Sequence, residues 1–234
     1  MPPIEEPAPQ PLAGAPVRVW DLPTRLFHGL LAAAVIGLLL TGPIGGNALV
    51  WHMRLGLSVG ALLLFRLLWG MVGGRWSRFR SFVHPPSAVA RYLRGRPLAD
   101  ERFDIGHSPL ASLSVFALLL LLAAQVATGL VADDEIATTG PLNRFVASST
   151  ASLATHWHKA FGRWLIWAWI GLHLGAIAWH VLIRHRALLR PMWTGGKLLP
   201  CGTPASTDSA GTRLLAILLA IACAALATWV AGLG

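Results

Sequence analysis

Two histidines lie inside one long apolar stretch, which runs from Trp157 to His180 and reads W-H-K-A-F-G-R-W-L-I-W-A-W-I-G-L-H-L-G-A-I-A-W-H. His158 and His173 are fifteen residues apart. In a helix they differ by about 60° in direction and by roughly 22 Å along the axis. A bilayer core is about 30 Å thick, so one imidazole falls in each leaflet. Because ionisable side chains in lipid are costly and mark functional sites, we hypothesise that each histidine is an axial ligand of one of two stacked haems.

Two further histidines offer partners at matching depths. His28 lies just inside the start of the first apolar segment, and His52 lies at the start of the second. Pairing by depth gives His52 with His158 for an outer haem and His28 with His173 for an inner haem. Each iron would then have two neutral imidazoles as axial ligands. Such a closed coordination sphere suits electron transfer better than oxygen binding.

Two other histidines and one arginine could also take part in haem binding. His156 precedes His158 by two residues and His180 follows His173 by seven, so each stays open as an alternative ligand. Arg66 lies inside the second apolar segment. A guanidinium in lipid needs an anionic or polar partner, and a haem propionate is a good one. We therefore expect Arg66 to take part in cofactor binding.

The two cysteines restrict the type of haem. Cys201 and Cys223 form neither a C-x-x-C pair nor the C-x-x-C-H motif of covalent attachment. Any haem is therefore expected to be a non-covalent haem b.

Five mainly apolar segments are long enough to position these residues in a membrane. They cover approximately residues 26–44, 51–72, 110–132, 156–183 and 214–233. Strand signals are nearly absent, so we expect an all-α integral membrane protein. The formal charge of +9 does not indicate nucleic-acid binding, because the basic residues cluster in alternate loops, as topology control requires.

The distribution of arginine and lysine predicts the orientation. The loops after the second and fourth segments carry Arg75, Arg78, Arg80, Arg91, Arg94, Arg96, Arg102, Arg184, Arg186, Arg190 and Lys197. The loop after the third segment is acidic. These loops predict a cytoplasmic N-terminus and a periplasmic C-terminus. Residues 1–16 are proline-rich, lack the features of a cleavable signal peptide, and are expected to be a disordered cytoplasmic tail.

The motifs resemble those of a known family, the bacterial cytochrome b561 and nickel–iron hydrogenase cytochrome b-subunit proteins, over roughly residues 17–197. The matching pieces, in order, are V-R-V-W-D-L-P-T-R-L-F-H, W-H-M-R-L-G, R-L-L-W-G, G-H-S-P-L, T-G-L-V-A-D-D-E-I-A-T-T-G-P-L, W-H-K, L-H-L-G-A-I and L-L-R-P-M-W-T-G-G-K. His107 occupies the G-H-S-P motif, where the family commonly has G-H-N-P. The resemblance assigns it no role.

This resemblance implies a four-helix bundle that holds two b haems, with ligands from its first, second and fourth helices. Carried onto this chain, the ligands are His28, His52, His158 and His173. The bundle would cover residues 17–197. A linker at 198–212 and a fifth transmembrane helix at 213–234 lie outside the usual four-helix core.

The expected function is electron transfer across the bacterial inner membrane, between a quinone pool and a partner such as a periplasmic c-type cytochrome or a hydrogenase. One branch of the family oxidises superoxide, so an enzymatic role stays open, as does a homo-oligomer. The alternative is a histidine-lined metal or proton transporter. That function predicts carboxylates near the histidines, whereas the five segments have essentially none. An intramembrane metalloprotease lacks its H-E-x-x-H motif.

Overall fold

The computed structural model describes residues 14–234 except 99 and 137. In this part of the chain, five helices are long and apolar enough to cross a membrane. They are α1 (Leu22–Ile44), α2 (Ala48–Val72), α4 (Pro109–Val131), a composite helix (Ser148–Ile183) and α8 (Ala210–Ala231). The composite helix joins α5 (Ser148–His156), the π-helical turn η3 (Trp157–Gly162), α6 (Arg163–Ala178) and a second π-helical turn η4 (Trp179–Ile183). The prediction of an all-α membrane fold with five spans is confirmed.

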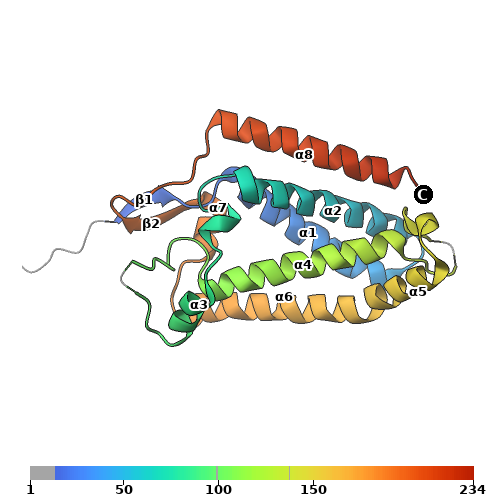
Figure 1. The fold of residues 1–234 in the computed structure, drawn as a ribbon, viewed down its shortest axis with the longest axis horizontal. Coiled ribbons are helices and arrows are strands. Elements are labelled where there is room, and N and C mark those ends of the chain that lie inside the picture. Colours follow the sequence, from blue (N-terminus) through green and yellow to red (C-terminus); the bar gives the residue numbers. More distant parts are fainter. Residues whose placement is uncertain (1–13, 99, 137) are drawn as a thin grey trace, which may run out of the picture.

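The shorter elements gather mainly at one end of the bundle (Figure 1). They are the strands β1 (Gly14–Arg18) and β2 (Gly196–Pro200), the helices α3 (Pro86–Leu93) and α7 (Leu189–Thr194), and the 3-10 turns η1 (Phe79–Ser81) and η2 (Asn143–Phe145). We call the end that carries β1, β2, α3 and α7 the inner end. The opposite end, where α1 turns into α2 and α4 leads to α5, is the outer end.

A buried carboxylate ties the first two spans together at the inner end. Asp21 is fully buried and caps α1 by accepting a hydrogen bond from the backbone N–H of Thr24. The same carboxylate accepts hydrogen bonds from Trp69 Nε1, the backbone N–H of Gly74 and the Ser77 hydroxyl. A buried charge is tolerated when such donors surround it, so the end of α2 is fixed against the start of α1.

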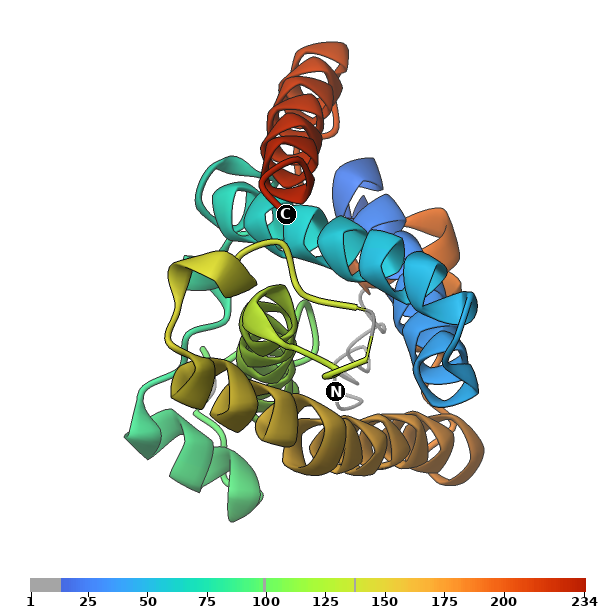
Figure 2. The ribbon, with the colours of Figure 1, turned by 90° about the vertical axis from the view of Figure 1, so that its right-hand side faces the viewer.

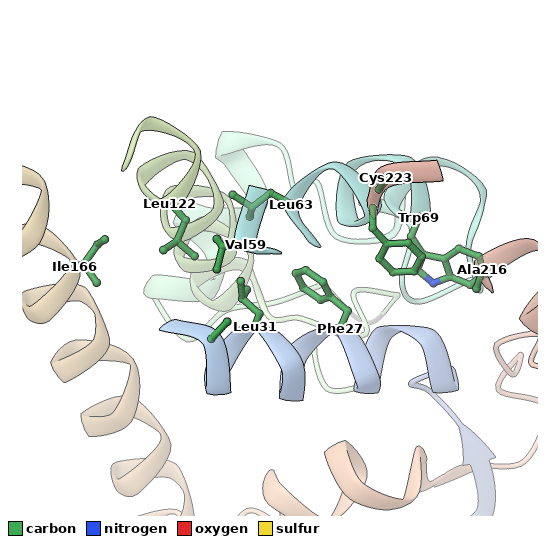
Figure 3. Close-up of a cluster of buried hydrophobic side chains, with 11 residues drawn as sticks. Phe27, Leu31, Val59, Leu63, Trp69, Leu122, Ile166, Ala216 and Cys223 are labelled. Atoms are coloured by element: carbon green, nitrogen blue, oxygen red, sulfur yellow. The ribbon is translucent and has the colours of Figure 1, made fainter. Parts of the chain in front are cut away.

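Four of the spans form a bundle, and the fifth lies on its outside (Figure 2). In this order along the chain, α1 packs on α2, α2 on α4, and α4 on α6, while α8 packs on α2 and contacts α1. One apolar cluster joins all five, with Phe27 from α1, Val59 from α2, Leu122 from α4, Ile166 from α6 and Cys223 from α8 (Figure 3). The fifth span therefore covers one face of the four-helix core.

A two-stranded sheet at the inner end was not expected from the sequence. β1 pairs antiparallel with β2, so that Gly14 lies opposite Pro200 and Arg18 opposite Gly196. Residues 14–16 of the predicted disordered tail and residues 198–200 of the predicted linker thus form strands, which corrects both boundaries. The prediction for residues 1–13 lies outside the described residues. The sequence did not reveal the sheet because its two strands lie about 180 residues apart, and no local pattern links them.

Candidate functional site

A cavity of about 1100 Å³ opens between the helices of the outer half of the bundle. Its walls come from α1, α2, α4 and α6, and both His52 and His158 line it. Pockets for small molecules and cofactors usually measure roughly 300–1,000 Å³. The outer half therefore has room for a bound group of cofactor size beside two histidines.

The rings of His52 and His158 face each other across 6.0 Å between their centroids, with their planes at 85°. Imidazole–metal bonds of about 2 Å on opposite sides of one metal ion, plus the distance from each nitrogen to its ring centre, give a centroid separation of roughly 6 Å. The pair is thus spaced for two axial ligands of one metal.

Hydrogen bonds fix the tautomer of both rings. The Thr41 hydroxyl donates to the carbonyl of Gly37 at 2.7 Å, so its oxygen is left to accept from His52 Nδ1 at 3.3 Å. His158 Nδ1 lies 2.9 Å from the carbonyl of Gln125, which can only accept. Each Nδ1 therefore carries the proton, and each Nε2 keeps a free lone pair for a metal.

Two glycines allow these rings to lie close to neighbouring helices. A β-carbon at Gly42 would be 3.2 Å from Cε1 of His52, and one at Gly129 would be 2.9 Å from Cε1 of His158. Both contacts are shorter than ordinary carbon–carbon van der Waals separations. The bare backbone at these positions forms part of the cradle for the histidines.

The π-helical turn η3 adjusts the direction of His158 relative to His173. Fifteen regular steps would leave them about 60° apart. A π-turn takes up one extra residue, so the rotation corresponds to about fourteen steps, which ends about 40° from alignment. His156 is exposed, lies edge-on to Phe161 and lines a separate surface pocket. Of the two neighbours, His158 is the one that faces the cavity.

The second predicted pair lies nearer the inner end. His28 of α1 and His173 of α6 are close enough to interact electrostatically. His173 is partly buried, whereas His28 is exposed. His180 lies in η4, and its Nδ1 is buried without a hydrogen-bond partner among the described residues. His180 thus keeps its place as an alternative to His173.

Arg66 is 4% exposed and lies near the inner end of α2. Its guanidinium stands over the ring of Phe79 at 4.6 Å and is attracted by Asp21. One terminal nitrogen, Nη1, is buried with no hydrogen-bond partner in the part of the chain that the structure describes. An unpaired buried donor costs about 1–3 kcal/mol, and more when charged. This donor suits an anionic group such as a carboxylate.

His107, in the loop before α4, lies close to Arg66 at the inner end. Its ring contacts Trp20, with 4.7 Å between centroids, and Phe82, at 4.4 Å. Burial, together with the nearby charge of Arg66, lowers the pKa of His107 to about 3. The family motif marked this position, but its neighbours come from three distant segments. The histidine is therefore held neutral at physiological pH.

Gln125 of α4 is a site residue that the histidine pattern did not reveal. Its side chain donates from Nε2 to the carbonyl of His158 at 2.8 Å, and its backbone carbonyl accepts from the His158 ring. Gln125 is the only amide side chain in the third span. A lone amide in an apolar helix was the signal that could have identified it.

The donor set fits a haem better than a bare metal ion. Within the described residues, no three side chains of the His, Cys, Asp and Glu types gather into one metal site. His52 and His158 instead meet as a pair, which matches ligation of an iron whose other ligands come from a macrocycle. The glycine cradle and the buried Arg66 donor agree with such a cofactor.

Comparisons with known proteins also point to haem b. The family model described as prokaryotic cytochrome b561 matches residues 19–195. The chain is 26% identical over 193 residues to a probable Ni/Fe-hydrogenase 1 B-type cytochrome subunit of Escherichia coli (strain K12), which covers 67% of this chain and 80% of that relative. The protein of the same name from Escherichia coli O157:H7 matches equally well. No solved structure matches the chain. The chain therefore belongs to the prokaryotic cytochrome b561 family, membrane proteins of electron transport that bind haem b.

Proposed function

We propose that the chain carries electrons across the membrane through two b-type haems, each ligated by two histidines. His52 and His158 would hold the outer haem, and His28 and His173 the inner one. The observation that carries this proposal is the pair of facing rings, 6.0 Å apart, at a cavity of about 1100 Å³. For the inner pair, the support is the electrostatic proximity of His28 and His173.

The chain's own groups prepare this arrangement. Thr41 and the carbonyl of Gln125 keep the Nδ1 atoms of the outer histidines protonated, so each Nε2 can bind iron. Arg66 would donate its unpaired Nη1 to a propionate of the inner haem. When bound, haem supplies one-electron chemistry, and the protein sets its potential, spacing and access. Two histidines per haem would leave no open site on the iron for oxygen, which suits electron transfer.

The charges of the chain support one direction in the membrane. The inner end carries most of the arginines, so we propose that it faces the cytoplasm of a bacterial cell and that the C-terminus faces the periplasm. The matched relatives are named as hydrogenase cytochrome subunits. By analogy, we propose a hydrogenase or a periplasmic c-type cytochrome as one redox partner and membrane quinone as the other.

The test is to replace His28, His52, His158 and His173 by alanine, one at a time, in the full-length protein. The haem-to-protein ratio and the low-spin absorption spectrum are measured after purification in detergent. We expect two haems per chain in the parent and one in each variant, with a different haem lost from the outer and inner pairs. A parent chain that is colourless and loaded with zinc would contradict the proposal and indicate a metal transporter. Loss of haem from His180→Ala, but not from His173→Ala, would move the inner ligand to His180.

A further inference from the structure

We infer that Gln125 is a positioning residue for the outer haem: its side chain holds the π-helical turn η3 and thereby sets the direction of the His158 ring. The inference depends on the proposed function in one respect, because it takes His158 as an axial ligand. Nothing in the family match or in the names of the relatives assigns a role to this glutamine.

Gln125 and His158 contact each other twice across the interface between α4 and η3. The Gln125 side chain donates from Nε2 to the His158 backbone carbonyl at 2.8 Å, and His158 Nδ1 donates to the Gln125 backbone carbonyl at 2.9 Å. The first bond fixes the backbone that carries the ring, and the second fixes the ring itself. The Thr128 hydroxyl, 3.4 Å from the same Nδ1, lies one turn further along α4. The ligand therefore has little freedom to rotate.

The π-helical turn η3 needs a contact that holds it. We call the hydrogen bond from Gln125 Nε2 to the His158 carbonyl the clamp. Such turns are rare, and they concentrate at functional sites because a regular helix is normally more stable. If η3 relaxed into α-helix, His158 would turn by about 100° relative to α6, the rotation of one residue. The imidazole would then point away from His52. The hydrogen bond from the Gln125 side chain is made to this turn and opposes the relaxation.

A glycine makes room for the clamp. Gly162, the last residue of η3, is buried, and a β-carbon there would lie 1.9 Å from Oε1 of Gln125 and 3.1 Å from Nε1 of Trp157. No real structure tolerates the first of these contacts. The Gln125 amide therefore occupies its position only because residue 162 has no side chain. Gln125 of α4 and Gly162 of η3 are thus both required for the hydrogen bond from the Gln125 side chain to the His158 carbonyl.

Among the described residues, only the Nε2 end of the Gln125 side-chain amide has a hydrogen bond. Gln125 Oε1 and Trp157 Nε1 are both buried, and neither has a hydrogen-bond partner among the described residues. The bond from Nε2 to the His158 carbonyl is therefore the single polar contact of the side chain in the described structure. Removing the donor removes this bond and leaves the bond between the His158 ring and the Gln125 backbone carbonyl in place, so the experiment tests the side chain alone.

Three variants of the full chain test the inference: Gln125→Leu, which removes the donor at similar volume, Gln125→Asn, which shortens the amide by one methylene, and Gly162→Ala, which displaces it. Gly211→Ala, in the first turn of α8 where a β-carbon meets only Ser209 Oγ at 3.9 Å, is the matched control. The readouts are the low-spin ferric electron paramagnetic resonance signal of each haem and the haem content after purification. Second-sphere partners of metal-bound histidines typically contribute 10–100-fold to affinity.

We expect the three variants to shift the outer haem signal and to weaken outer haem retention by about 10–100-fold. The inner haem signal should keep its shape and intensity and so reports that the bundle is folded. Gly211→Ala should behave as the parent. Signals unchanged in all three variants, or both haems lost together, would overturn the positioning role. His158→Ala separates the two ideas: if it retains both haems, the ligand assignment itself is wrong, whereas loss of one haem with silent Gln125 variants refutes only the clamp.

Discussion

If the chain holds the two proposed haems, deletion of Ala160 should leave both bound, although it brings the proposed ligands His158 and His173 one residue closer in sequence. Ala160 lies in η3, between His158 and His173. The π-turn η3 contains one residue that adds no net rotation. His158 and His173 are therefore related by the rotation of about fourteen α-helical steps, or roughly 1400°. Removing one residue lets the turn close into regular α-helix with fourteen real steps. The rotation is then again about 1400°, and His158 still faces the cavity.

Insertion of one alanine after Ala160 should have the opposite effect. η3 already holds one extra residue, so a second one turns His158 by about 100° relative to α6. A helix with its side chains has a radius of about 5–6 Å, and at this radius a turn of 100° moves the imidazole by roughly 8 Å. Because a metal–imidazole bond is about 2 Å long, the outer haem should lose this ligand.

The assay is the haem-to-protein ratio of the purified chain, together with the low-spin spectrum of each haem. The expected result is two haems for the deletion and one for the insertion. In the shortened helix, Gln125→Leu should also do less damage than in the parent, because no π-turn remains to be held. The reasoning about helical phase fails if the deletion loses the outer haem while the insertion retains it, or if both variants keep two haems.

Three other substitutions test the close approach at Gly129, the buried carboxylate Asp21 and the buried imidazole His107. Gly129→Ala should weaken outer haem binding, because its β-carbon would lie 2.9 Å from Cε1 of His158; haem content reports this, with the inner haem unaffected. Asp21→Ala should cost about 3 kcal/mol or more of stability, because it strands several buried donors; thermal unfolding in detergent measures it. His107→Leu should flatten the acid side of the stability profile. The pKa of His107 is lowered to about 3 in the fold, so below pH about 6.5 only the unfolded chain takes up this proton, and the parent loses up to about 1.4 kcal/mol per pH unit down to pH about 3. An equally steep profile for the variant would show that another group is responsible.

The spans were predictable because lipid imposes one rule on every segment. A helix of about 20 apolar residues is required to cross the bilayer, and all five segments carry that signal in composition alone. The candidate histidines were also recognisable, because an ionisable group stands out against an apolar background. The depth argument paired His52 with His158, and these two rings do meet. Their role as iron ligands stays a prediction.

The parts that the sequence did not predict depend on contacts between distant residues. The start of the composite helix at Ser148 was missed by eight residues, because its first turns read S-S-T-A-S-L-A-T and are too polar to resemble a span. The β1–β2 sheet requires a partner far along the chain. The π-turn has no side-chain signature of its own, because what marks it is a hydrogen-bond register. Its partner Gln125 could be recognised only once α4 and η3 were side by side.

Uncharged groups contact the rings of His52 and His158, and this suits a position inside a membrane. A carboxylate would be the stronger partner for a ligand imidazole, but an ionised group in lipid costs several kcal/mol unless it is fully paired. The partners found here are the Thr41 hydroxyl for His52 and the backbone carbonyl of Gln125 for His158. These groups fix the tautomer without adding charge. The buried carboxylate Asp21 lies instead at the inner end, where the backbone N–H groups of Thr24 and Gly74, at the ends of α1 and α2, donate hydrogen bonds to it. The acceptor for His158 is thus a main-chain carbonyl, which carries no charge, whereas the charged acceptor Asp21 stands where several donors surround it.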